Sequence, residues 1–316
     1  MLDLAYKGLA QFASPGGKRG KLQIFIFHRV LDQKDPLMPG EPDIVQFEGV
    51  IKSISCVFNT LRLDEAVERL KQGRLPTRAA SITFDDGYLD NLENAWPILK
   101  KYNVPMTVFV ATDFTQGQMM WNDVIIESVR KLNKPLRLPE LGHESIDFSV
   151  AESQLSKLHM LINKVKYLQP SERATIVDKI AFQANYQMEP LMMNEAQLKS
   201  LDADGVLIGA HTQSHPILTS LTDQEAEQEI QQSKVRLEAL LGKPVDYFAY
   251  PNGRLDADYN QCHVKIVEGL GFKAAVSTNK GVANSNAPMF ELPRFTPWDI
   301  NMNKFILRSI FYNIQA

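Results

Sequence analysis

Two short motifs hold the residues of this 316-residue chain whose types and spacing could do chemistry. His211 and His215 lie four positions apart, and on one helical turn both imidazoles would point to the same side. Two such nitrogens commonly bind one metal ion, which then needs a third ligand. Asp85 and Asp86 can supply a carboxylate from a motif that ends 125 residues before His211. Together the motifs predict a metal-dependent hydrolase.

Strands and helices that alternate along the chain must bring these motifs together. The acidic pair follows an apolar run that predicts a buried strand over 79–84, and Asp-Asp-Gly predicts the turn that leaves it. Alternation of this kind favours a parallel sheet, and barrel folds carry their chemistry at the carboxyl ends of the strands. We therefore expect an α/β barrel. Its other strands are predicted at 22–27, 106–110, 205–209, 247–250, 273–276 and 288–293, and its helices at 63–71, 90–101, 222–241 and 259–270.

Residues 116–195 interrupt the alternation. Amphipathic patterns predict two helices there, over 153–168 and 171–186, and strand signals are sparse. We interpret the segment as a helical insertion between two barrel units rather than as an independent domain. A single domain would then span 1–316, with an N-terminal extension at 1–20.

The N-terminal extension has an amphipathic pattern of its own. Leu2, Ala5, Leu9 and Phe12 recur at helical spacing and are followed by three basic residues. This pattern predicts a helix that covers the open end of the barrel. The alternative is a helix through which residues 1–20 contact a membrane surface.

Composition limits the classes of function. The formal net charge of −3 gives no electrostatic reason to bind nucleic acid. No apolar stretch reaches the roughly 18 residues of a transmembrane helix, and Met1–Ala13 lacks the apolar core of a signal peptide. We therefore expect a cytoplasmic protein, with peripheral membrane contact left open. Cys56 and Cys262 form no disulfide framework or thiolate metal site, although one bridge between them remains conceivable.

The two motifs belong to a wider resemblance. Thr-Phe-Asp-Asp-Gly at 83–87 and His-Thr-Gln-Ser-His at 211–215 resemble the polysaccharide deacetylases, the NodB-homology family also called carbohydrate esterase family 4. Segments 248–253, 292–295 and 24–28 continue the likeness over most of 20–310. The resemblance implies a distorted (β/α)7-type barrel. It also implies a hydrolase that removes acetyl groups from N-acetylated hexosamines of an oligo- or polysaccharide and releases acetate.

The resemblance also implies roles for the residues of the two motifs. Asp86, His211 and His215 would bind a divalent metal, first of all Zn²⁺, with Co²⁺, Ni²⁺ and Mn²⁺ as alternatives that the same ligands suit. Asp85 would be the general base that takes a proton from the attacking water. The adjacent carboxylates are thus expected to differ in function.

His28 has a candidate role that depends on strand order. In many relatives the acid histidine comes late in the chain. Residues 24–28 resemble that late segment moved to the front, as in the circularly permuted deacetylases of the poly-N-acetylglucosamine type. The first and last strands of a barrel are neighbours, so such a move is tolerated. His28 would then be the general acid that protonates the leaving amine.

One part of the family pattern is missing. Common members carry an arginine at the place of Ala249, where it orients the base. We expect Arg294 to replace it and to hold Asp85. The backbone N–H of Asn252 matches the family's oxyanion donor, a role in which an asparagine side chain does no harm.

Three aromatic residues are candidates for packing against sugar rings, namely Trp121, Trp298 and Tyr250. The alternative for each is a place in the core. Rival functions also stay open: an O-deacetylase, or a deformylase-like amidohydrolase on a sugar nucleotide or lipid-linked glycan. The remaining rival is a catalytically silent carbohydrate-binding protein.

Overall fold

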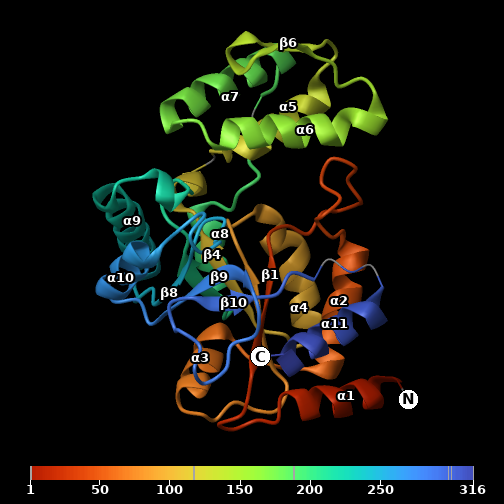
Figure 1. The fold of residues 1–316 in the computed structure, drawn as a ribbon, viewed down its shortest axis with the longest axis vertical. Helices are drawn as coiled ribbons and strands as arrows, with labels where there is room; N and C mark the ends of the chain where they lie inside the picture. Colours follow the sequence, from red (N-terminus) through yellow and green to blue (C-terminus); the bar gives the residue numbers. More distant parts are fainter. Residues whose placement is uncertain (1, 117, 188, 298, 300, 316) are drawn as a thin grey trace. The chain divides into compact units, whose positions relative to one another are not determined.

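Seven parallel strands form the wall of a nearly closed barrel, which confirms the expected (β/α)7-type fold (Figure 1). The computed structural model describes residues 2–116, 118–187, 189–297, 299 and 301–315. The barrel closes where Ile26 donates to the carbonyl oxygen of Phe295 at 3.1 Å, beside β1. In spatial order the strands are β1 (Leu22–Phe27), β3 (Ala79–Phe84), β4 (Met106–Val110), β7 (Leu207–Ala210), β8 (Tyr247–Ala249), β9 (Ala274–Lys280) and β10 (Leu292–Arg294), and β2 (Asn59–Thr60) pairs with β3.

Both faces of the strands are buried, as expected for a parallel sheet covered by helices. In β1, Leu22 and Ile24 belong to the cluster inside the barrel, whereas Phe25 and Phe27 pack outward against the helices. Inside the barrel the ring of Phe109 presses on Gly209. A Cβ at Gly209 would lie 2.5 Å from that ring, so only glycine fits there.

Helices surround the barrel, with α9 and α10 on one side and α2, α4 and α11 on the other (Figure 1). A capping box opens the longest helix, because Thr222 and Glu225 each accept the other's backbone N–H with their side chains. The helices of the barrel unit are α1 (Leu2–Ala13), α2 (Ile44–Val57), α3 (Leu63–Lys71), α4 (Trp96–Lys101), α8 (Glu195–Ala203), α9 (Asp223–Leu241), α10 (Gln261–Gly269) and α11 (Met302–Gln315), with a π-helical turn (Asn91–Ala95) before α4 and 3₁₀ turns at Thr112–Gln116 and Leu218–Ser220.

Residues 117–191, together with 34–39, form a second compact unit. Its own hydrophobic cluster includes Leu37, Ile125 and Leu161. The insertion expected at 116–195 therefore has a hydrophobic core of its own, separate from the core of the barrel. Its elements are α5 (Trp121–Lys131), β5 (Leu136–Leu138), a 3₁₀ turn (Pro139–Leu141), β6 (His143–Ile146), α6 (Ala151–Lys166) and α7 (Pro170–Ala184), and β5 and β6 pair antiparallel.

Two expectations from composition can be compared with the structure. Cys56 and Cys262 are free thiols, so the bridge left open between them does not form. None of the helices in the described part of the chain has the length and hydrophobicity of a membrane span.

Candidate metal centre and active site

Asp85 and Asp86 are the first two residues after β3, where the predicted turn is present. The N–H of Asp85 donates to the carbonyl oxygen of Phe27 at 3.0 Å, which ties this turn to the end of β1. Asp86 has φ 76° and Gly87 has φ 88°, so the chain turns sharply through the left-handed region. Both carboxylates are buried at the carboxyl end of the barrel.

His211 and His215 do not lie on a helical turn, and that prediction is wrong. Residues 211–215 form a loop after β7. Thr212 and His215 have φ 63° and 56°, and the hydroxyl of Thr212 accepts the N–H of His215 at 3.2 Å. The two rings nevertheless converge, with centroids 4.8 Å apart. Left-handed backbone, rather than helical periodicity, brings them together.

Three donor atoms from these two turns surround one point. Oδ1 of Asp86 lies 3.4 Å from Nε2 of His211 and 3.4 Å from Nε2 of His215. This oxygen is buried and has no hydrogen-bond partner among the described residues. Nδ1 of His211 lies 2.7 Å from the carbonyl oxygen of Ala249, so Nε2 is left to face the cluster. Two nitrogens around an unpartnered oxygen fit a divalent cation with open coordination positions.

The charge states of the three groups suit a cation. Burial lowers the pKa of His215 to about 4, so its ring is neutral at pH 7. Burial also lowers the pKa of His211, but the carboxylates of Asp85 and Asp86 raise it more, and the net shift is upward. Burial raises the pKa of Asp86, but His215 and His211 lower it by a larger amount. The net shift is downward, so Asp86 stays ionised at neutral pH. Because a metal ion binds only a ring nitrogen without a proton, a metal ion and a proton compete for Nε2 of His211.

The contact expected between Arg294 and Asp85 is present. The guanidinium donates to both carboxylate oxygens, at 2.7 and 2.6 Å, and donates from Nε to the carbonyl oxygen of Ser277 at 2.8 Å. Arg294 and Asp85 are 1% and 2% exposed, so the pair crosses the inside of the barrel without contact to bulk water. Burial raises the pKa of Asp85, but Arg294 and His211 lower it more. Asp85 is thus oriented and ionised.

His28 lies beside the two carboxylates. It follows β1 directly, and β1 pairs in register with β3 so that Phe27 lies opposite Phe84. A charge on its ring lowers the pKa of both Asp85 and Asp86, although less than the groups named above. Asn91 donates to the carbonyl oxygen of His28 at 2.8 Å and fixes its backbone. The backbone of His28 thus lies next to the turn that carries Asp85 and Asp86, and its role as the acid stays a prediction.

This geometry can be compared with that of known proteins. The sequence profile of the polysaccharide deacetylase family matches residues 72–145 and 171–275, which is more than half of the chain and includes all three candidate ligands. The chain belongs to the polysaccharide deacetylase family. His28 and Arg294 lie outside the matched ranges. Their positions therefore come from the structure rather than from the family match.

Several relatives are similar over different lengths. YxkH of Bacillus subtilis strain 168, assigned by name to the polysaccharide deacetylases, is 25% identical over 279 residues, which cover 88% of this chain and 71% of YxkH. The poly-β-1,6-N-acetyl-D-glucosamine N-deacetylase of Staphylococcus aureus strain MRSA252 is 44% identical over 135 residues, which cover 42% of this chain and 44% of that enzyme. The match to the staphylococcal enzyme thus spans less than half of its length.

Solved structures share the fold of this chain. The Streptococcus pyogenes deacetylase PplD, in complex with acetate, superposes with a TM-score of 0.62 at 20% identity, over 92% of this chain and 98% of PplD. IcaB from Ammonifex degensii superposes with a TM-score of 0.59 at 18% identity, over 92% and 97% of the two chains. Similarity at this level of identity establishes the fold.

The candidate oxyanion donor lies in a tight turn after β8. Asn252 has φ 58° and Gly253 has φ 73°. Thr278 on β9 holds this turn, because its hydroxyl donates to the carbonyl oxygen of Asn252 at 2.6 Å. A Cβ on Gly253 would lie 2.8 Å from the backbone nitrogen of Thr278, so the turn packs directly on β9. The turn is fixed at the carboxyl end of β8.

One residue that supports the candidate metal centre was not predicted from the sequence. The carboxylate of Glu229 on α9 accepts the N–H of Gln213 at 3.0 Å, the N–H of Ser214 at 2.8 Å and the hydroxyl of Ser214 at 2.7 Å. These bonds hold the loop between the two histidines. The sequence contains one signal for such a residue. Ser214 lies between the two candidate ligands, and its hydroxyl needs a hydrogen-bond partner in an ordered loop.

The three aromatic candidates have different surroundings. Tyr250 is 0% exposed and stacks on Tyr259 with ring centroids 3.8 Å apart. Its ring therefore offers no face to a sugar in this structure, and it belongs to the core. Trp121 begins α5 in the second unit, where Arg173 lies 5.5 Å above its ring. Trp298 lies outside the described residues.

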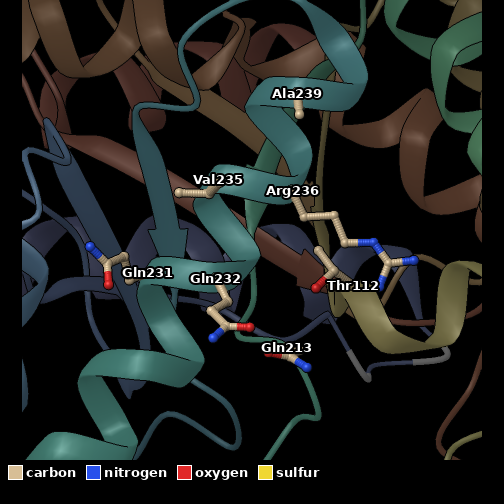
Figure 2. A pocket seen from close by; sticks show the side chains of 7 residues that line it. All are labelled: Thr112, Gln213, Gln231, Gln232, Val235, Arg236 and Ala239. Carbon is tan, nitrogen blue, oxygen red and sulfur yellow. The ribbon is translucent and has the colours of Figure 1, made fainter.

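A pocket of about 350 Å³ opens beside the histidine loop, on the outer face of α9 (Figure 2). Gln213 and Thr112 come from the loops after β7 and β4, and Figure 2 shows Arg236 reaching from α9 toward Thr112. None of Asp85, Asp86, His211 or His215 lines it. This pocket is a neighbour of the metal centre and not the metal centre itself.

Proposed function

We propose that the protein is a metal-dependent deacetylase that removes acetyl groups from N-acetylated hexosamines in an oligo- or polysaccharide and releases acetate. One observation carries the proposal: the Asp86, His211 and His215 donors lie beside a buried Asp85 that Arg294 holds in place. A bound divalent ion supplies Lewis acidity, which makes water more acidic and polarises a carbonyl group. Zn²⁺ suits this nitrogen and oxygen set, with Co²⁺, Ni²⁺ and Mn²⁺ as alternatives.

The residues of the chain divide the remaining work. Asp85 is ionised at neutral pH and keeps acceptor capacity on each oxygen beside its bonds to Arg294, so it accepts the proton of the attacking water. The N–H of Asn252 donates to the oxygen of the acetyl group as negative charge develops on it. His28 donates a proton to the nitrogen as the C–N bond breaks. Water and amide thereby yield acetate and a free amine.

The relatives support N-acetylhexosamine as the substrate class. The staphylococcal enzymes are N-deacetylases of poly-β-1,6-N-acetyl-D-glucosamine by name. The circularly permuted order inferred from residues 24–28 belongs to the proposal as well, supported by the position of β1 between β3 and the segment after β10. Location in the cytoplasm, expected from the sequence, stays a prediction.

Acetate release tests the function. The substrates are N-acetylated oligosaccharides, O-acetylated oligosaccharides, N-acetylated sugar nucleotides and lipid-linked glycans, each with the chelated protein and with added Zn²⁺. We expect release from N-acetylhexosamine oligomers that requires metal and is lost in His211→Ala. Release from O-acetylated glycans alone would establish the rival O-deacetylase. Binding of oligosaccharide with no release from any substrate would establish the silent carbohydrate-binding protein.

His28 is tested by comparing leaving groups. An amine is a poor leaving group and needs the proton, whereas an activated aryl alcohol does not. His28→Ala should therefore lower N-deacetylation by a factor on the order of 10² or more and spare hydrolysis of an aryl acetate. His159→Ala, a histidine on α6 of the second unit, is the control. Equal loss on both substrates would show that His28 is not the acid.

A further inference from the structure

Large hydrophobic side chains are exposed on one group of helices. Eleven such side chains are exposed in the described part of the chain, and seven of them lie on α1, α2 and α11. The three helices pack on one another beside the barrel. We call the seven residues the apolar face. They are Leu4, Leu9, Phe12, Val45, Leu307, Phe311 and Ile314.

Six of the seven residues of the apolar face lie on the outer sides of two amphipathic helices, α1 and α11. On α1, Ala10 and Ala13 point inward and are buried, whereas Phe12 is 84% exposed. On α11, Leu307, Phe311 and Ile314 recur at i, i+4 and i+7 and form one stripe. Phe311 is 54% exposed. Two phenylalanines and several branched aliphatic chains gathered on packed helices indicate an interaction site rather than scattered surface residues.

Basic residues accompany the apolar face. Residues 1–21 carry four basic residues and one acid, a formal charge of +3, and residues 299–316 carry two basic residues and one acid, a formal charge of +1. The whole chain has a net charge of −3, so all other residues together carry −7. Lys18 and Arg19, which follow α1, are exposed. Positive charge is therefore concentrated around the apolar face of an otherwise acidic protein.

This charge distribution decides between two occupants of the face. A second copy of the chain would bring the same positive charges together, because a two-fold interface matches a surface with itself. A bilayer with anionic lipids offers both an apolar interior and negative phosphate groups. The complementary occupant is the membrane.

Helix α1 and the end of α11, which carry Phe12 and Phe311, lie at the end of the barrel opposite the candidate metal centre. Ser14, directly after α1, accepts the N–H of Arg78 with its carbonyl oxygen, just before β3 begins. Lys21, just before β1, donates to the carbonyl oxygen of Asn313 on α11, and Gln23 accepts from the side chain of Asn313 at 2.7 Å. The candidate ligands instead follow the carboxyl ends of β3 and β7. A protein bound through the apolar face leaves that end of the barrel accessible.

We propose that the apolar face of α1, α2 and α11 binds the surface of an anionic membrane. Phe12 and Phe311 insert at the level of the acyl chains, and Lys18 and Arg19 contact lipid phosphates. This membrane contact is independent of the proposed reaction, since no candidate catalytic residue belongs to it. It also extends the sequence-based alternative for residues 1–20, because α11 supplies three of the seven residues of the apolar face.

Vesicle sedimentation tests the proposal. Full-length protein is mixed with vesicles of phosphatidylcholine alone or with one third phosphatidylglycerol. We expect binding to the anionic vesicles only, weakened by added salt. The double variant Phe12→Ser with Phe311→Ser should reduce binding by at least about tenfold, because two large apolar side chains no longer enter the bilayer. Lys18→Glu with Arg19→Glu should reduce it as well.

The matched control is Phe182→Ser, which changes a phenylalanine that is 87% exposed on α7 of the second unit. It should bind vesicles like the wild type. Acetate release from a soluble oligosaccharide should be the same in all four proteins, which separates loss of membrane contact from loss of fold or of the reaction. Wild-type protein that ignores anionic vesicles would overturn the proposal. So would a dimer in analytical ultracentrifugation that the Phe12→Ser, Phe311→Ser variant converts to a monomer.

Discussion

Left-handed backbone is concentrated around the candidate metal centre. Eight non-glycine residues of the described chain have positive φ, and four of them are at the site: Asp86, Thr212, His215 and Asn252. Such a conformation costs on the order of 1 kcal/mol or more for each residue, and more for β-branched Thr212. Surrounding contacts must therefore impose it. The left-handed conformations lower the free energy of unfolding, and they also let the candidate ligand atoms converge on one point.

Asp85 and Asp86 should separate by phenotype, because one contacts Arg294 and the other the histidines. Asp86→Asn should lose bound metal, since it removes the charged ligand. Asp85→Asn should keep about one metal ion per chain and lose turnover by a factor on the order of 10² to 10⁴. Metal content is measured by atomic absorption on dialysed protein and turnover by acetate release. Equal loss of metal in both variants would contradict the division of roles.

Removing one partner of the buried Asp85–Arg294 pair should strongly destabilise the barrel. Arg294→Met leaves a buried carboxylate without its counter-charge and should lower the free energy of unfolding by about 3 to 5 kcal/mol. Adding Asp85→Asn to that variant should recover part of the loss, because no buried charge remains. The measurement is urea unfolding. Arg69→Met, which breaks an exposed pair with Glu65, is the control and should cost no more than about 1 kcal/mol.

The same pair fixes a pH dependence. The pKa of Asp85 is lower in the folded protein than its unfolded value of about 3.9, so its contribution is fully present above that value. It is lost as the pH falls further through the folded pKa. The difference in unfolding free energy between wild type and Asp85→Asn should therefore be constant near neutral pH and shrink below about pH 4. A difference that grows on acidification would contradict this sign.

At the residue scale the sequence predicted which residues form the candidate site better than it predicted their backbone conformations. Asp85, Asp86, His211 and His215 could be identified because residue type and order carry the chemistry. The loop that joins the histidines could not, since a spacing of four residues fits a helical turn equally well, and left-handed Thr212 has no sequence signal. The predicted contact of Arg294 came from a missing arginine at Ala249, which left a carboxylate without a partner.

Helix α9 supports the candidate metal centre, because its Glu229 accepts hydrogen bonds from the loop between the two histidines. Glu229→Gln should weaken metal binding by about 10- to 100-fold, because a neutral amide replaces a carboxylate that accepts three hydrogen bonds from the ligand loop. Competition with a metal-binding dye measures the affinity, and Co²⁺ absorption reports ligand geometry. Glu227→Gln, exposed on the same helix, should leave both unchanged. Unaltered affinity and spectrum in Glu229→Gln would remove this role.

Elements with strong local signals were predicted well. The strands buried on both faces read as continuous apolar runs, and α9 has a capping box at Thr222 and ends at Gly242 in the left-handed conformation. Other elements lacked such signals. Helices α2, α8 and α11 depend on packing against the barrel, and the pairing of β5 with β6 depends on contacts within the second unit.

At the scale of the whole molecule, all candidate ligands belong to one of the two compact units. Metal should therefore stabilise the barrel unit, by about 2.7 kcal/mol at a free metal concentration one hundred times Kd. Chelation should increase hydrogen exchange in β3 and β7 and leave residues 117–191 unchanged, as followed by mass spectrometry. In His211→Ala, chelation should have no effect. Exchange that rises equally in both units would mean that they unfold together.

The sequence predicted the barrel and the position of its insertion but not the insertion's separate core. Alternation of strands and helices is a local pattern that a reader can follow along the chain. The core of the second unit instead requires residues 34–39 to join a segment that begins about eighty residues later. The amphipathic pattern of the insertion predicts its helices, but no local pattern indicates that residues 34–39 join them.

The buried ion pair between Asp85 and Arg294 has a consequence for how homologous sequences diverge. A lineage that loses catalysis by changing Asp85 inherits an uncompensated guanidinium inside its barrel, so selection for folding then acts on position 294. Substitutions at 85 and 294 should therefore appear together in diverged copies of this gene. Copies that have lost His211 or His215 but still fold should retain both partners. The order in which an inactive descendant lost its site residues should then be visible in its sequence, and the buried pair should be the last to change.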